Sequence, residues 1–182
     1  MSIKPDELRK RLPPEVRAEI MRDNWISHDA RWFLKVGTEC GFETANKLNK
    51  AILKSMAKTE MRRLMNATGC GEIGDAEELV ELVNIAFDVY FPPSMIDWVS
   101  KATGKDSIVG IVNRCYVHEE VKRAGVTGMY ECACGHRLEG WLAACDLKGE
   151  VRIVKSLMRE DPICEVLGTS ICRLTDDKKS GD

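Results

Sequence analysis

Three cysteines and a histidine lie close together in the stretch YECACGHRLEGWLAAC, which runs from Tyr130 to Cys145. Thiolates and imidazoles are ligands that zinc prefers, and about four of them complete a tetrahedral site. Cys132 and Cys134 are two positions apart, so in an extended strand both side chains point to the same face and can reach one ion. The pattern is neither the C-x-x-C pair of a zinc knuckle nor the C-x-x-C-H of covalent haem attachment.

The first prediction is therefore a metal site at Cys132 and Cys134, with His136 and Cys164 as candidates to complete a zinc site. An iron–sulfur cluster needs about four cysteines and is the alternative cofactor, with Cys132, Cys134, Cys145 and Cys164 as its ligands. Cys145 also falls in step with the apolar face of a predicted helix, where cysteine acts as a small hydrophobic residue. The other cysteines have no partner at ligand spacing and are predicted to be packing or loop residues: Cys40, Cys70, Cys115 and Cys172.

A reactive thiol is the second chemistry that these residue types allow. A thiolate at Cys132 or Cys134 would attack a substrate, with His28 or His136 as the base, because a cysteine nucleophile needs a neighbouring base or a lowered pKa. In a third interpretation the cysteines are small core residues and the protein has a structural role.

A candidate ligand site lies on a predicted N-terminal helix. Trp25, His28, Asp29 and Trp32 fall within roughly a third of the helix circumference at 3.6 residues per turn. Two aromatic rings beside a polar pair would form one wall of a pocket for an apolar ligand, with His28 as a base or metal ligand. The same stripe is also typical of core packing, in which His28 and Asp29 bond to a neighbouring backbone.

Arg137 is the candidate for binding a charged group on a ligand. It stands at a predicted helix start, where peptide N–H groups already favour anions, and its guanidinium would bind a carboxylate. Pairing with Glu139 or Asp146 on the surface is the competing interpretation. The expected ligand is therefore a small hydrophobic or carboxylate-bearing molecule.

The N-terminal region, residues 1–104, is predicted to be helical. Apolar spacing predicts helices over residues 16–36 and 43–66. A third helix opens at Asp75, where Glu78 follows three residues later as in a capping box. It ends before the run Phe91-Pro92-Pro93, because proline cannot continue a helix.

Residues 105–176 are predicted to form a mixed α/β unit. The pattern indicates a strand over 109–117, a short strand over 129–134 and a helix over 136–147. Residues 151–158 and 163–174 read as a β-hairpin, with turn residues at 159–162. The tail, residues 177–182, is predicted to be disordered. The fold class is α+β, a helical N-terminal half packed on a small mixed C-terminal unit with a terminal β-hairpin, together one compact domain.

Composition narrows the functional classes. The chain has 182 residues, a formal net charge of −2 and no basic stripe, so no nucleic-acid partner is expected. No run of about 18 apolar residues predicts a membrane span, and the charged start MSIKPDELRKRLPPEV lacks the apolar core of a signal peptide. We therefore expect a cytoplasmic protein, in which eight cysteines are thiols or metal ligands rather than disulfides.

The C-terminal stretch GWLAACDLKGEVRIVKSLMREDPICEVLGTSI resembles the end of 4-vinyl-reductase-type domains. Gly140 opens the match, Glu160-Asp161-Pro162 stands at the turn, and Cys164 is the cysteine after it. The resemblance implies a compact, often dimeric α/β domain that holds a small hydrophobic or aromatic molecule, so we expect a homodimer. Some members bind zinc through a glutamate and cysteines, part of the set lying on this hairpin. Among those hairpin positions only Cys164 is retained, because Ile153 and Ser156 stand at the others.

The N-terminal stretch NWISHDARWFLKVGTECGFETANKLN is similar to uncharacterised prokaryotic proteins related to L-2-amino-thiazoline-4-carboxylic acid hydrolases. Those proteins also place a tryptophan, a His-Asp pair and a Trp-Phe pair on an early helix. The leading hypothesis is a cytoplasmic small-molecule-binding protein that carries a metal at its cysteine cluster. The alternatives are a cysteine-dependent C–N hydrolase of the thiazoline-carboxylate type and a structural protein with core cysteines.

Overall fold

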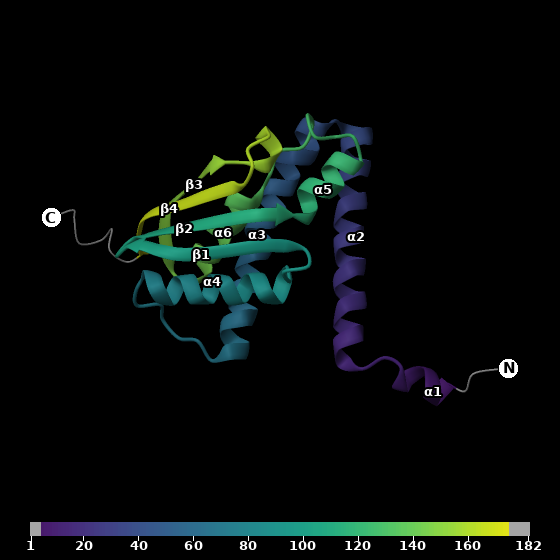
Figure 1. Ribbon diagram of the computed structural model, residues 1–182, viewed down its shortest axis with the longest axis horizontal. Coiled ribbons are helices and arrows are strands. Elements are labelled where there is room, and N and C mark those ends of the chain that lie inside the picture. The colour runs from purple at the N-terminus through teal and green to yellow at the C-terminus, as the bar shows by residue number, and fades with distance from the viewer. Residues whose placement is uncertain (1–4, 175–182) are drawn as a thin grey trace. The chain divides into compact units, whose positions relative to one another are not determined.

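A computed structural model describes residues 5–174, which form an α+β fold with helices first and an antiparallel sheet after them (Figure 1). This confirms the fold class expected from the sequence. The chain divides into two compact units, and the boundary lies inside a helix, between Ala45 and Asn46. The disorder predicted for residues 177–182 falls outside the described residues.

The first unit contains α1 (Pro5–Lys10), α2 (Pro14–Cys40) and the first turn of α3 (Phe42–Thr68). Pro14 starts α2, since a proline in the first turn sacrifices no helical hydrogen bond. Gly41 ends the helix at φ 86°, a conformation that favours glycine. The Phe33 and Phe42 rings then pack across this break, with centroids 5.9 Å apart.

The second unit contains the rest of α3 and α4 (Ala76–Tyr90) before the sheet begins. The predicted cap of α4 is present, because the Asp75 carboxylate accepts a hydrogen bond from the Glu78 N–H at 2.9 Å. The Glu78 carboxylate reaches back to the Gly74 N–H at 2.6 Å. Together these bonds satisfy N–H groups that the helix itself cannot pair.

The sheet has four antiparallel strands in the order β1-β2-β4-β3. These are β1 (Ile96–Gly104), β2 (Ser107–Cys115), β3 (Leu147–Lys155) and β4 (Cys164–Arg173), so β1 and β3 are the edges. Two helices, α5 (Tyr116–Arg123) and α6 (Cys134–Ala144), connect β2 to β3, and the short 3-10 helix η1 (Leu157–Arg159) lies in the β3–β4 turn. The predicted hairpin is confirmed by the direct pairing of β3 with β4.

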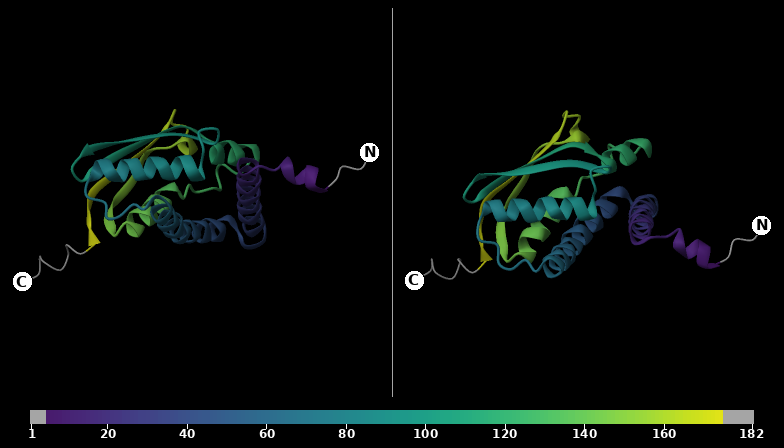
Figure 2. Two further views of the ribbon diagram at one scale, coloured as in Figure 1. Left: turned by 90° about the horizontal axis from the view of Figure 1, so that it is seen from below. Right: turned by 60° about the horizontal axis from the view of Figure 1, so that its bottom comes forward.

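Helices α4 and α6 lie along one face of this sheet (Figure 2). Phe87 of α4 stacks on Trp98 of β1, with centroids 4.0 Å apart. The Phe87 ring also packs edge-to-face with the Trp141 ring of α6, with centroids 5.2 Å apart, and Trp141 is only 1 % exposed. The core of the second unit therefore lies between these two helices and what we call the covered face of the sheet.

Three elements differ from the sequence predictions. Strand β1 occupies residues 96–104, the end of the region expected to be helical. The expected strand over 109–117 stops at Cys115, and an amphipathic helix, α5, follows it. The short strand expected over 129–134 is a loop, and α6 begins at Cys134. Asn46 holds that loop, since its amide donates to the Met129 carbonyl and accepts from the Glu131 N–H, bonds that a neighbouring strand would otherwise supply.

Over residues 5–174, no helix has both the length and the apolar character needed to span a bilayer.

Candidate functional site

The register of the sheet places Cys164 on the covered face. Cys164 of β4 pairs with Val112 of β2, and Val112 pairs with Trp98 of β1. Residues that pair directly in an antiparallel sheet project to the same face. Because Trp98 stacks on Phe87 of α4, Cys164 lies on the side that the helices cover.

A β-bulge brings Cys115 to the same face. The β1–β2 register skips Asn113, because its neighbours Val112 and Arg114 pair with consecutive residues of β1. One extra residue in a strand reverses the alternation of the side chains that follow it. Cys115, which pairs with Ile96, therefore faces the same side as Val112 instead of the opposite one.

The start of α6 brings the two remaining thiols to this corner. A Cβ atom added to Gly135 would lie 3.7 Å from the Ile153 side chain, so the first turn of α6 rests on the covered face. Ile153 pairs with Val166, which is two residues from Cys164 on the same face. Cys134 is the first residue of α6, and Cys132 lies two residues before it in the preceding loop. We call Cys115, Cys132, Cys134 and Cys164 the four-thiol cluster.

The ionisation of Cys132 and Cys134 responds to the other thiols of the cluster. Burial raises the pKa of Cys132 to about 11, the peptide N–H of Cys134 lowers it in part, and negative charge at Cys115 and Cys164 raises it further. Burial also raises the pKa of Cys134 well above its usual value, with added repulsion from the other three thiols and some relief from Arg137. Without a bound cation, both groups are neutral thiols at physiological pH.

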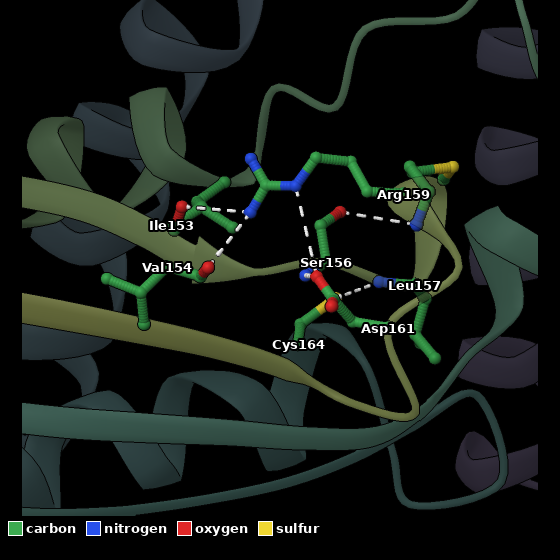
Figure 3. A network of polar contacts seen from close by, with 8 residues as sticks. Ile153, Val154, Ser156, Leu157, Arg159, Asp161 and Cys164 are labelled. Carbon is green, nitrogen blue, oxygen red and sulfur yellow. Dashed lines mark hydrogen bonds and ion pairs between the residues drawn. The ribbon is translucent and has the colours of Figure 1, made fainter.

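The turn after β3 fixes the position of Cys164 (Figure 3). The Leu157 N–H donates a hydrogen bond to the Cys164 Sγ atom at 3.3 Å. The Asp161 carboxylate accepts from the Ser156 N–H at 2.7 Å, and the Arg159 guanidinium donates to two backbone carbonyls at the end of β3. The sulfur therefore faces a peptide donor in a well-braced turn.

Within residues 5–174, no group of three or more His, Cys, Asp or Glu side chains is placed to hold a metal ion. His136 turns toward Glu139, with its Nδ1 atom 3.4 Å from Glu139 Oε2. Cys145 caps the far end of α6, roughly 16 Å from Cys134 at 1.5 Å per helical residue. The iron–sulfur set expected to include Cys145 is therefore not brought together. Instead the structure places Cys115 beside the other three thiols. Sequence spacing assigned Cys115 to packing, because the bulge that redirects it leaves no recognisable sequence signal.

Cys145 has the packing role that its helical spacing indicated. It is buried, and its Sγ atom lies 4.0 Å from the Met65 Sδ atom. Burial raises the pKa of this thiol to about 12, so it remains neutral.

Arg137, expected to receive a ligand carboxylate, is paired inside the protein. Its Nη1 atom lies 2.9 Å from Glu60 Oε1, and its guanidinium lies 4.5 Å from the centre of the Phe91 ring. The Trp141 indole donates to the other Glu60 oxygen at 3.0 Å. Glu60 is 2 % exposed and was not foreseen, because this pairing depends on α3 packing against α6.

The remaining ligand candidates lie on α2 in the first unit. Trp25 and Trp32 are half-buried, whereas His28 and Asp29 are exposed. The stripe is therefore apolar on its buried side and polar on its solvent side, as on an amphipathic helix.

A small apolar cavity of about 20 Å³ lies between the helices and the covered face. Its lining comprises Val83, Trp98, Ile108, Gly110, Leu138, Trp141, Leu142, Val151, Val166 and Gly168. This volume would admit about one water molecule, but a stable buried water needs two to four polar partners. An apolar cavity of this kind stays dry and is suited to hydrocarbon.

The raised pKa values in the four-thiol cluster do not favour nucleophilic catalysis. A cysteine nucleophile reacts as the thiolate, which a lowered pKa or an adjacent base makes available. Burial instead raises the pKa of Cys132 and Cys134, and the groups that shift them do not include a histidine. The chemistry that suits these thiols better is coordination, in which a cation displaces the protons.

Comparison with known proteins places the chain in a family. Residues 15–154 match a family of unknown function, DUF6125, and the chain belongs to it. No curated protein matches the sequence. The fold is similar to the crystal structure of a trafficking protein particle complex subunit 3 from Naegleria fowleri covalently bound to palmitic acid. That match has a TM-score of 0.56 and 12 % identity, and it covers 85 % of this chain and 95 % of the other.

Proposed function

We propose that this family member is a cytoplasmic small-molecule-binding domain whose ligand is an apolar chain held between α4, α6 and the covered face of the sheet. The observation that carries the proposal is the dry apolar cavity at that interface. Ligand sites are mostly apolar and lie where secondary-structure layers meet. The fatty acyl class is chosen because the structural neighbour is described as covalently bound to palmitic acid.

The cavity is smaller than such a ligand, so binding requires that it open. Trp98 is the wall best placed to move, because it lies on β1, an edge strand, and is only half-buried. One hydrogen bond, from its indole N–H to Asn84 Oδ1 at 3.0 Å, holds the ring beside its stacking contact with Phe87. Gly110 already lies under this ring, since a Cβ there would come within 2.0 Å of it.

The proposal is tested by calorimetric titration of octanoate, laurate and palmitate into the full-length protein and two variants. Val151→Phe places a ring in the cavity from edge strand β3, and Val99→Phe adds the same ring on the opposite face, where Val99 is 54 % exposed. We expect binding that strengthens with chain length, as about 0.8 kcal/mol per buried CH₂ predicts. Val151→Phe should weaken it and Val99→Phe should not.

Thermal melting of each variant establishes that it is folded before it is titrated. No binding by the wild type, or equal weakening by both variants, would contradict the proposal. The homodimer expected from the sequence remains a prediction.

A further inference from the structure

We propose that Cys115, Cys132, Cys134 and Cys164 bind one zinc ion as thiolates at the corner of the sheet where α6 begins. This site is separate from the apolar cavity and does not depend on the ligand proposed for it. The thiols come from the end of β2, the start of α6 and the start of β4. A metal there would tie together three elements that are distant in the sequence.

Strand register and one helix contact direct these thiols to one corner of the sheet. Cys164 faces the helices because it pairs with Val112, and the bulge at Asn113 turns Cys115 to the same side. The first turn of α6 rests on Ile153 of that face, which positions Cys134 and, two residues earlier, Cys132.

Peptide N–H groups lie near this corner, where they stabilise thiolate charge. Leu157 donates to Cys164 at 3.3 Å. Cys115 stands at the N-cap of α5, beside the N-terminal N–H groups of that helix, and Cys132 lies two residues before α6. Hydrogen bonds to the sulfurs are a recurrent feature of thiolate metal sites, because they orient the ligands and offset their negative charge.

Zinc is the cation that suits this set. Four sulfur ligands indicate zinc or an iron–sulfur centre, and a structural zinc site has no ligand position left for solvent. The side chains are not yet arranged as a coordination shell, so each thiol must rotate about χ1 between its staggered positions to close the site. Binding is not a redox step: one Zn²⁺ replaces four protons, which leave to solvent as four Zn–S bonds form.

The test uses the full-length protein, stripped with a chelator and reloaded with zinc alone, with metal per chain measured by mass spectrometry. Four variants carry serine at Cys115, Cys132, Cys134 or Cys164, and affinity is read by competition with a chromophoric chelator. We expect one zinc per wild-type chain and a loss of about ten-fold or more in affinity for each variant. Two controls should retain zinc: Cys172→Ser, the same change elsewhere on β4, and His136→Ala.

A second measurement keeps the test decisive if a serine variant does not fold. Cysteine alkylation of the wild type, mapped by peptide mass spectrometry with and without zinc, should show protection at the four thiols and none at Cys40 or Cys172. Loss of zinc with His136→Ala but not with Cys115→Ser would overturn the assignment. A wild type that takes up no zinc, or that carries iron with labile sulfide at these cysteines, would overturn it as well.

Discussion

Arg137 and Glu60 form a buried ion pair between α6 and α3, with the Arg137 Nη1 atom 2.9 Å from Glu60 Oε1. The second Glu60 oxygen accepts from the Trp141 indole, and the Arg137 guanidinium rests on the Phe91 ring. Each charged group therefore has partners that offset the cost of removing it from water. The pair orients α6, which supplies part of the cavity wall and Cys134 of the four-thiol cluster.

Breaking this pair on one side should be strongly destabilising. Arg137→Met leaves the Glu60 carboxylate buried without its cation, which costs about 3–5 kcal/mol of unfolding free energy. Urea unfolding of Arg137→Met, Glu60→Leu and the double variant measures the coupling. The double variant should lose less than the sum of the two single losses, because it leaves neither charge unpaired. Strictly additive losses would show that the two side chains act independently.

Close contact between α6 and α3 should make Gly140 intolerant of a side chain. A Cβ atom there would lie 2.5 Å from the Lys54 carbonyl oxygen and 2.7 Å from the Ala57 Cβ. Since backbone cannot give way cheaply, Gly140→Ala should lower the unfolding free energy by about 1–3 kcal/mol. The matched control is Gly128→Ala, where a Cβ meets nothing within 4 Å. Equal effects of the two changes in urea unfolding would rule out this account of the interface.

Alkaline pH should destabilise the protein partly through Cys145. Burial, with added repulsion from Cys70 and Asp146, raises the pKa of this thiol from the ordinary 9.0 to about 12. The unfolded chain therefore loses the proton first, and the native state binds more protons in that interval. Stability from this group is complete below about pH 9 and falls as pH rises toward 12.

The measurement is the slope of unfolding free energy against pH above pH 9 for the wild type and Cys145→Ala. The variant loses packing at all pH values, but its slope should be shallower because the titrating group is gone. An unchanged slope would show that Cys145 titrates alike in the folded and unfolded states.

Local signals predicted the elements well, whereas long-range packing decided the site. The cap at Asp75 and the β3–β4 hairpin follow from nearby residues, and both are present. The grouping of Cys132, Cys134 and Cys164 at one metal remains a prediction, and the strand expected to present the first two is a loop. Cys115 was missed because a bulge at Asn113 reverses its direction, and strand alternation alone cannot reveal a bulge.

Neither the cavity nor the buried ion pair could be predicted from the sequence. Gly110 of β2 lies under Trp98 on the covered face, and a glycine carries no apolar signal that would mark this face in the sequence. The Glu60–Arg137 contact joins residues far apart in the chain, and only helix packing shows that the two charges meet.

The most direct test of the central claim locates the ligand by tryptophan fluorescence. Trp98 and Trp141 line the cavity, and replacing Trp25 and Trp32 with phenylalanine leaves these two as the only indoles in a chain that has four. Titration with a brominated fatty acid should then quench most of the emission, because bromine quenches only on close contact, and unbrominated palmitate should reverse it. Saturable binding that leaves the emission of Trp98 and Trp141 unquenched would place the ligand elsewhere and contradict the account.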